Sequence, residues 1–224
     1  MLVHSPLVGP TTWKWVADEL RTSGHEVVVP CIDPTSTAKG WRAVVDSVFS
    51  QVGRCDGTVF VAHSGAGPLM TSIVGDSGSA DPMIVLVDAG IASETSETRL
   101  MPEEFLGELT AMAVDGVLPP WSEWLGPDVM EELIPDSARR ASIEGELPSV
   151  PLSYFSGVVP PARPWPATRN GYVLLSDAYL GDAEEARRRR WPVVEVRGTH
   201  LGLVTDPTGV AEAITAVVES SLEP

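Results

Sequence analysis

Ser64 lies where a predicted β-strand turns abruptly into a predicted helix. The stretch "VFVAHSGAGPLM" (residues 59–70) begins with an apolar run typical of a strand and continues with a helical pattern. Ala62 and Ala66 stand two positions to either side of the serine, and only small side chains fit beside such a turn. The turn would expose the hydroxyl and direct free N–H groups of the helix toward it. We interpret Ser64 as a nucleophile; the alternative is a serine that only caps a helix.

A serine hydroxyl is a weak nucleophile and needs a base. Of the four histidines, only His200 follows the last predicted strand, in the loop "RGTHLGLVTDP", which places it at the same sheet edge as Ser64. We expect His63 to point away from the serine, His25 to lie in an exposed loop, and His4 to line the site without acting as base. Ser64 and His200 therefore form the predicted nucleophile and base.

A carboxylate should hold the imidazole in the correct tautomer and stabilise its protonated form. Asp177 follows the predicted strand "YVLL" and Asp88 follows "MIVLV", so both should lie at the correct edge of the sheet. We prefer Asp177, because an acid on that strand reaches a histidine on the next loop most directly, and keep Asp88 as the alternative acid.

These residues require a parallel sheet to hold them. Apolar runs rich in Val, Leu and Ile alternate with helical patterns, which is typical of a sheet covered by helices on both faces. We predict a three-layer, doubly wound α/β fold with about six, mostly parallel strands. The predicted strands are residues 2–4, 26–31, 58–62, 83–87, 172–175 and 193–196. The predicted core helices are residues 12–23, 41–52, 182–190 and 207–222, with another that begins at Pro68.

Residues 91–170 break this alternation and form a predicted lid or cap, inserted into a core of residues 1–90 and 171–224. The insertion contains helical patterns at 102–113, 127–133 and 136–145 and then a proline-rich return. An insertion at the carboxyl edge of a parallel sheet lies where ligands bind. We therefore expect its aromatic residues to line an apolar substrate pocket over the serine, the candidates being Trp121, Trp124, Tyr154 and Phe155.

Composition excludes several classes of function. The formal net charge of −16 argues against binding to nucleic acid or to an anionic membrane, and disfavours an acidic substrate. Cys31 and Cys55 have no metal-ligand spacing, no phosphate-binding glycine loop is present, and the "RRRR" at 187–190 fits a solvated helix end. We see no signal peptide, and expect a cytoplasmic protein with reduced thiols, no cofactor, no metal and a small-molecule substrate.

The chain resembles the α/β-hydrolase superfamily from end to end. It is most similar to the small enzymes related to plant hydroxynitrile lyases and methylesterases, and to their bacterial relatives. "LVHSPLVGPTTW" matches the H-G-x-x-x-G-x-x-x-W opening loop, "AHSGAG" the nucleophile turn, and "GTHLGL" the histidine loop. The resemblance implies the α/β-hydrolase fold, a Ser-His-Asp triad and an oxyanion hole that includes the Gly65 N–H.

Two departures from the family pattern concern the site. The family's acid lies three residues past a small residue that ends the penultimate strand, and counting from Ser176 this position holds Tyr179. The second oxyanion donor is the N–H two residues after the loop histidine, His4, and here that residue is Pro6, which has no N–H. We expect the Leu7 N–H to replace this donor.

These features predict a serine hydrolase that acts on a small to medium ester or thioester with an apolar acyl part. One alternative is a lyase or elimination enzyme that uses the same Ser-His pair as a base, because it needs less oxyanion stabilisation. Another is a binding protein on a hydrolase scaffold, although the intact Ser64 and His200 argue against it.

Overall fold

A parallel β-sheet forms the centre of the molecule. The computed structural model describes residues 1–52, 58–124 and 128–222. Within these ranges the sheet has five strands in the order β1-β2-β3-β8-β9, and each pair of neighbours is parallel. The strands are β1 (Leu2–Val3), β2 (Val59–Ser64), β3 (Met83–Ala89), β8 (Arg169–Leu174) and β9 (Val193–Glu195).

The strand predicted at residues 26–31 is absent from the described sheet, which has five strands where about six were predicted. The segment does lie beside β1, because the Leu2 N–H donates to the Val28 carbonyl at 2.9 Å. Two features limit the pairing: β1 is only two residues long, and Pro30 has no N–H to donate.

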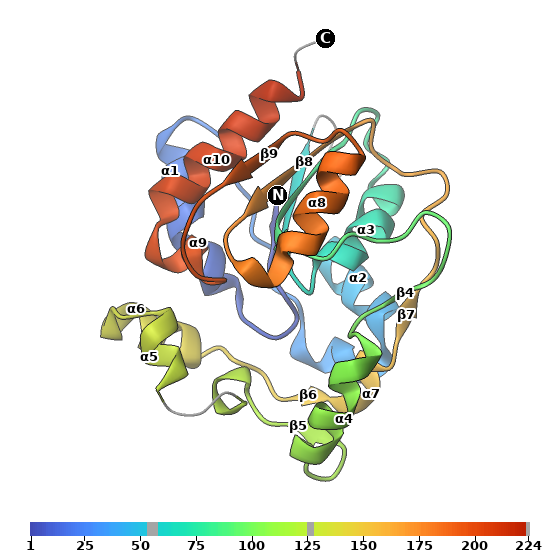
Figure 1. The fold of residues 1–224 in the computed structure, drawn as a ribbon, viewed down its shortest axis with the longest axis vertical. Helices are drawn as coiled ribbons and strands as arrows, with labels where there is room; N and C mark the ends of the chain where they lie inside the picture. Colours follow the sequence, from blue (N-terminus) through green and yellow to red (C-terminus); the bar gives the residue numbers. More distant parts are fainter. Residues whose placement is uncertain (53–57, 125–127, 223–224) are drawn as a thin grey trace.

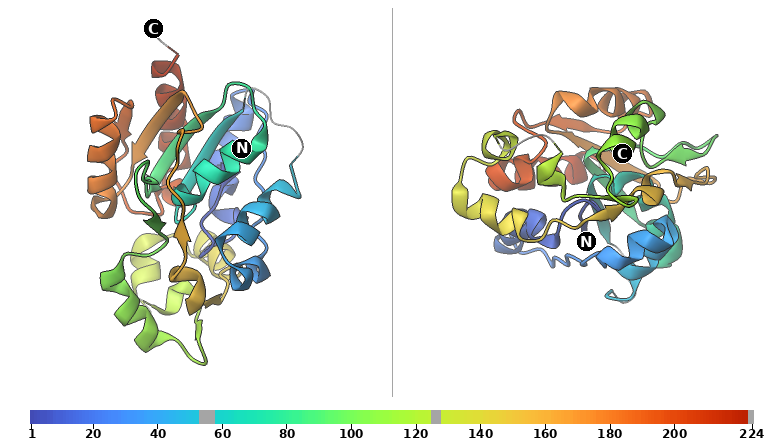
Figure 2. Two further views of the ribbon diagram at one scale, coloured as in Figure 1. Left: turned by 90° about the vertical axis from the view of Figure 1, so that its right-hand side faces the viewer. Right: turned by 90° about the horizontal axis from the view of Figure 1, so that it is seen from below.

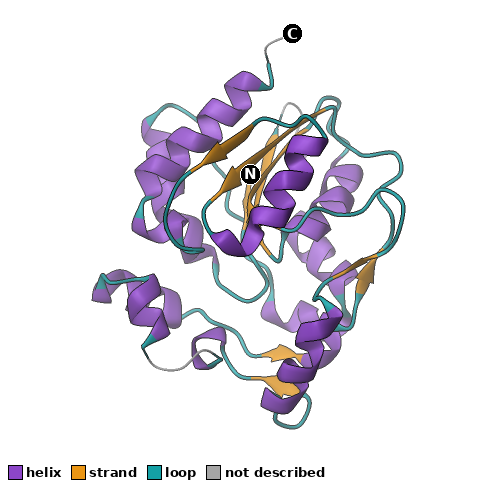
Figure 3. Ribbon diagram, viewed as in Figure 1, coloured by secondary structure: helices purple, strands orange, loops and turns teal. Residues whose placement is uncertain are grey.

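Helices cover both faces of the sheet, as predicted (Figures 1 and 3). One face carries α1 (Lys14–Thr22), α9 (Gly202–Thr205) and α10 (Pro207–Ser220). The other carries α2 (Trp41–Phe49), α3 (Met70–Ser77) and α8 (Leu180–Arg188). Short 3-10 helices are η1 (Pro10–Trp13), η2 (Pro34–Lys39), η3 (Gly67–Leu69) and η5 (Asp177–Tyr179).

Alternating side chains on the strands divide the interior into two cores. On β3, Ile84 and Leu86 pack with α2, α3 and α8, whereas Val85 and Val87 pack with α1 and α10. This two-residue period explains why the central strands read as continuous apolar runs, since both of their faces are buried.

The segment between β3 and β8, which we call the insertion, lies at one end of the sheet (Figures 1 and 2). Two antiparallel pairs brace it, β4 with β7 and β5 with β6. Its elements are β4 (Thr98–Arg99), α4 (Glu103–Met112), β5 (Val117–Leu118), η4 (Trp121–Glu123), α5 (Val129–Leu133), α6 (Ser137–Glu144), β6 (Val150–Pro151), α7 (Leu152–Phe155) and β7 (Val158–Val159). Pro127, the predicted start of one helix, and Cys55 lie outside the described residues.

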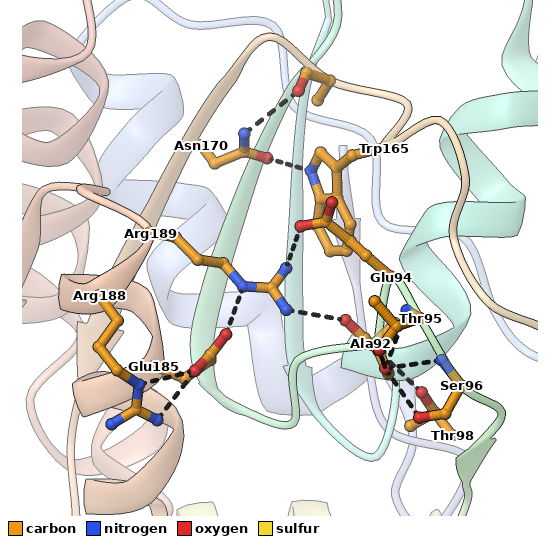
Figure 4. A network of polar contacts seen from close by, with 12 residues as sticks. Ala92, Glu94, Thr95, Ser96, Thr98, Trp165, Asn170, Glu185, Arg188 and Arg189 are labelled. Atoms are coloured by element: carbon orange, nitrogen blue, oxygen red, sulfur yellow. Dashed lines mark hydrogen bonds and ion pairs between the residues drawn. The ribbon is translucent and has the colours of Figure 1, made fainter.

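Arg189 ties the first part of the insertion to the core (Figure 4). It follows α8, and its side chain is only 16% exposed, so the prediction of a solvated arginine run is wrong at this position. Its Nε donates to Glu185 at 2.7 Å, and its guanidinium reaches the Ala92 carbonyl at 3.4 Å and the Glu94 carboxylate at 3.2 Å. The charge run therefore supplies a structural contact at the stem of the insertion.

The same guanidinium also contacts Trp165, which lies in the last part of the insertion before β8, and Trp191, which follows α8. It lies 5.1 Å from the ring centre of Trp165 and 5.4 Å from that of Trp191. The Trp165 Nε1–H donates to Asn170 Oδ1 at 2.8 Å, which fixes the indole beside β8 (Figure 4). The first and last segments of the insertion thus both contact Arg189.

None of the helices in residues 1–52, 58–124 and 128–222 has the length and apolar character that a membrane crossing requires.

Candidate active site

Ser64 is the last residue of β2 and has a left-handed backbone, with φ of 56°. The register with β3 shifts between His63 and Ser64, so the serine leaves the strand pattern at this point. A non-glycine residue with positive φ is strained by about 1–3 kcal/mol, and such strain is common at active sites. Gly67 follows closely, and a Cβ there would lie 2.3 Å from the Gly90 carbonyl oxygen. Glycine is therefore needed at position 67, where the start of the helix packs against the Gly90 backbone.

His200 connects the serine to a buried carboxylate. Its Nδ1 lies 2.8 Å from Asp88 Oδ2, and its Nε2 lies 3.0 Å from Ser64 Oγ. Because a carboxylate only accepts hydrogen bonds, Nδ1 carries the proton and donates to Asp88. Nε2 then holds the free lone pair and accepts the Ser64 hydroxyl hydrogen. This tautomer can remove a proton from the serine.

Asp88 is fully buried and held from three sides. Its carboxylate accepts hydrogen bonds from the Leu175 and Ser176 N–H groups at 2.9 and 3.0 Å, and from the Ser176 hydroxyl at 2.5 Å. Burial alone would raise the pKa of Asp88, but these hydrogen bonds and the one from His200 outweigh it and hold the pKa below its usual value. Asp88 therefore stays ionised beside His200.

Asp177, the preferred acid of the sequence analysis, does not occupy this place. It begins η5 and its side chain is exposed, whereas the alternative, Asp88, contacts His200. The preference for Asp177 is wrong because the chain after β8 turns into η5, which carries this carboxylate into solvent. Asp88 also has a left-handed φ of 44°, and the sequence does not show that β3 bends there.

Two rings stack on the imidazole of His200. The His63 ring centre lies 4.5 Å away, and its Nε2–H donates to the His200 carbonyl at 3.0 Å, so the prediction that His63 points away is wrong. Tyr179 stacks at 5.2 Å with only 13° between the ring planes. His63 also contacts Trp13, which belongs to the core on the side of α1 and α10. Tyr179 packs against the other core, on the side of α2, α3 and α8. The imidazole is thus held between residues of the two cores.

Burial keeps His63 neutral. Removal from water lowers the pKa of His63 to about 3, and the proximity of His200, which repels a second positive charge when it is protonated, acts in the same direction. A neutral ring can stack on His200 without repelling it when His200 takes up a proton. Sequence reasoning missed this residue, because its position next to the nucleophile says nothing about where its side chain points.

His4 fixes the opening loop and is not free to act as a base. Its Nε2 accepts the Ile32 N–H at 3.0 Å, and its Nδ1 donates to the Ser5 carbonyl at 2.8 Å. Burial lowers the pKa of His4, which keeps the ring in this neutral form. Both ring nitrogens are therefore used to hold the loop in place.

The loop brings Ser5 and Pro6 close to the turn after Ser64. A Cβ on Gly65 would lie 3.2 Å from Ser5 Oγ and 3.9 Å from the Pro6 ring. The Leu7 N–H donates to Ser5 Oγ at 3.3 Å, a long hydrogen bond. Among the described residues the Gly65 N–H has no hydrogen-bond acceptor. One backbone donor is thus free and a second is weakly held.

Glu146, which follows α6, joins the insertion to this loop. Its carboxylate accepts hydrogen bonds from the Thr11 N–H at 3.0 Å and the Thr11 hydroxyl at 2.6 Å. The carboxylate lies over Gly9, where an added Cβ would come within 2.5 Å of the Glu146 Cβ. Glycine is needed at position 9 because the insertion packs directly on its backbone.

The four aromatic residues expected to bind substrate contribute to packing. Tyr154 and Phe155 are each 3% exposed, and their rings meet edge to face with centres 5.3 Å apart. The ring centre of Trp124 lies 6.1 Å from that of Phe155. Trp121 packs instead against the core on the side of α1 and α10. Their role in substrate binding remains a proposal, and Tyr154 and Phe155 are already enclosed.

No group of three or more His, Cys, Asp or Glu side chains in the described part of the chain is arranged to hold a metal ion. The polar groups at Ser64 are suited to nucleophilic or base chemistry.

Comparison with known proteins gives matches in structure only. No protein-family model and no curated protein sequence matches the chain. An extracellular α/β-hydrolase from a Paenibacillus species superposes with a TM-score of 0.74 at 16% identity, covering 99% of this chain and 98% of that one. Polyneuridine aldehyde esterase gives 0.71 at 12% identity, with 98% and 97% covered. A pyrethroid hydrolase from Sphingobium faniae JZ-2 gives 0.65 at 16% identity, with 98% and 96% covered.

These superpositions span both the core and the insertion. The chain therefore has the α/β-hydrolase fold, as its sequence motifs imply. Its buried Ser64–His200–Asp88 network is consistent with the triad that such a fold can carry.

Proposed function

We propose that the chain is a serine hydrolase that acts on a small to medium ester or thioester with an apolar acyl part. The observation that carries this proposal is the continuous hydrogen-bond chain from Asp88 through His200 to Ser64, with contacts of 2.8 and 3.0 Å. A serine activated in this way can attack an acyl carbon.

Each residue then has one role. Ser64 Oγ attacks the carbonyl carbon while His200 Nε2 takes the hydroxyl proton, which it later gives to the leaving group. Asp88 holds the Nδ1–H of His200 and stabilises the imidazolium ion. The N–H groups of Gly65 and Leu7 stabilise the negative charge on the carbonyl oxygen. Water repeats these steps and releases the acid.

The character of the surroundings supports the choice of substrate. The insertion supplies apolar side chains, of which Trp124 is only partly buried and stands edge to face with the Phe155 ring. The net charge of −16 disfavours acidic substrates, because a negative surface repels them. A neutral ester with an apolar acyl part avoids this repulsion.

Labelling with a serine-directed fluorophosphonate tests this proposal. We expect one label on Ser64 of the folded protein, no label on Ser64→Ala, and hydrolysis of p-nitrophenyl butyrate only by the wild type. Failure of the folded wild-type protein to label or to turn over the ester would overturn the proposal. Circular dichroism of both proteins is the control that checks that they are folded.

A lyase or elimination reaction is the second candidate, and Pro6 is the observation that favours it. This residue removes one backbone donor, and the neighbouring Leu7 N–H is engaged by Ser5 at 3.3 Å. Proton abstraction by the Ser64–His200 pair depends less on an oxyanion hole. Steady turnover of p-nitrophenyl esters that is lost in Ser64→Ala would argue against this candidate.

A further inference from the structure

Tyr179 contacts both the nucleophile and the base. Its hydroxyl oxygen lies 3.3 Å from Ser64 Oγ, and its ring stacks on His200 with centres 5.2 Å apart. The residue ends η5, the short helix that follows β8. The strand that was expected to supply an acid therefore supplies a phenol.

Counting donors and acceptors gives the direction of the contact with Ser64. The serine has a single hydroxyl hydrogen, and His200 Nε2 accepts it at 3.0 Å, because Nδ1 donates to Asp88. Ser64 Oγ therefore has no second hydrogen to offer to Tyr179. The phenol must be the donor, and the serine oxygen accepts its hydrogen bond.

This leaves Ser64 Oγ with a defined geometry. Of its two lone pairs, one accepts the hydrogen bond from Tyr179 and the other is free to attack a carbon atom. Tyr179 and His200 thus fix the orientation of the attacking lone pair from two directions.

We propose that Tyr179 is a further catalytic residue, whose hydroxyl donates to Ser64 Oγ and stabilises the negative charge that develops on this oxygen. The inference rests on the proposed function, since it concerns the same reaction.

The charge develops twice in each turnover. In acylation, an electron pair of Oγ forms the bond to carbon, the Oγ proton moves to His200 Nε2, and the carbonyl π pair moves to the carbonyl oxygen. When this pair returns, the bond to the leaving group breaks and the leaving group takes the proton from His200. In deacylation, water gives a proton to His200 as it attacks, and the carbon–Oγ bond breaks with its pair on Oγ, which recovers that proton.

Tyr179 keeps its own proton throughout these steps. Burial raises the pKa of Tyr179, so the phenol is protonated at neutral pH and remains a donor. It is placed to act on Oγ rather than on the carbonyl oxygen, because the oxyanion loop follows β1 and Tyr179 follows β8. These strands lie on opposite sides of β2, which carries Ser64.

The variant Tyr179→Phe tests the inference, because it removes the hydroxyl and keeps the ring over His200. We expect the rate constant for covalent labelling of Ser64 by a fluorophosphonate to fall by about 10- to 100-fold, the range of one hydrogen bond to a charged group. The concentration of probe at half-saturation and the unfolding temperature should stay unchanged. With p-nitrophenyl butyrate, both the acylation burst and the later steady rate should slow.

A second variant separates the hydroxyl from the ring. Tyr179→Leu also removes the stacking on His200, so its labelling rate should fall below that of Tyr179→Phe. A Tyr179→Phe protein that labels at the wild-type rate overturns the inference and leaves the proposed function in place. Folded wild-type protein that does not label overturns the proposed function, and this inference with it.

Discussion

Asp88 and His200 are 112 positions apart in the chain, and their side chains meet at 2.8 Å inside the protein. The carboxylate comes from the end of β3 and the imidazole from the loop after β9, with β8 lying between these two strands in the sheet. The Leu175 and Ser176 N–H groups, just after β8, hold the carboxylate across this gap. His200 is therefore oriented by a carboxylate from β3, which lies two strands away from β9 in the sheet.

Replacing this acid should nearly abolish activity. Asp88→Asn keeps the size of the side chain but offers an N–H to His200, which favours the wrong tautomer, so kcat should fall by about 10⁴-fold. Asp177→Asn is the matched control, and its exposed side chain should change kcat by no more than about 2-fold. Hydrolysis of p-nitrophenyl butyrate measures both, and a larger loss in Asp177→Asn would restore the original assignment.

A proline at position 7 should remove the remaining donor of the opening loop. Leu7→Pro deletes the N–H that stands next to Pro6, and the loss of one oxyanion donor costs about 10²–10³-fold in kcat. Leu7→Ala keeps the N–H and should stay within about 3-fold of wild type. Rates for p-nitrophenyl butyrate, with circular dichroism as a check on folding, decide the matter. Equal rates for the two variants would show that Leu7 supplies no such hydrogen bond.

Stability should decrease as pH falls from about 6.5 toward 3, and His63 is one cause. The folded protein holds the pKa of His63 at about 3, whereas an unfolded histidine titrates near 6.5. In this window the unfolded chain binds a proton that the folded chain does not, so the free energy of unfolding drops by up to about 1.4 kcal/mol per pH unit.

Urea unfolding between pH 5 and 7 measures this slope. His63→Phe keeps a ring against His200 and removes the proton, so its stability should depend less on pH. Buried His4, whose pKa is also lowered, leaves some slope in the same direction. His25→Asn, at an exposed position, is the control and should keep the wild-type slope. An unchanged slope in His63→Phe would contradict the assignment.

Arg189 should stabilise the protein far more than its neighbour does. Arg189→Met removes the contacts to Ala92 and Glu94 and leaves the Glu94 carboxylate without its ion-pair partner, which should lower the free energy of unfolding by about 2 kcal/mol. Arg188→Met also breaks a contact to Glu185, but its side chain is 64% exposed, so the loss should be below about 1 kcal/mol. Urea unfolding compares the two, and equal losses would mean that Arg189 does not hold the insertion.

Much of the fold and half of the site follow from local patterns. Ser64 and His200 could be identified because each stands in a motif and follows a strand whose end must lie at one edge of a parallel sheet. The helix at the C-terminus is equally clear from the sequence, since Asp206 can cap its free N–H groups and Pro207 fits its first turn. In the structure Asp206 accepts the Gly209 N–H at 3.0 Å, which confirms the cap.

The remaining residues depend on side-chain direction and on contacts between distant segments. Asp88 and Asp177 both follow strands, and only the left-handed backbone at Asp88 and the η5 turn at Asp177 separate them. His63 and Tyr179 meet His200 through packing of the two cores, which no spacing in the chain records. Residues 26–31 have the composition of a strand, but the two-residue strand β1 beside them and Pro30 limit the pairing.

The contact of Glu146 with Gly9 and Thr11 links two equilibria. Since the same residues hold the insertion and the opening loop, any ligand that binds the loop more tightly when the insertion is docked must stabilise docking by the same free energy. A ligand with this preference therefore favours the docked insertion, and the difference between its affinities for the docked and undocked forms measures the strength of that coupling.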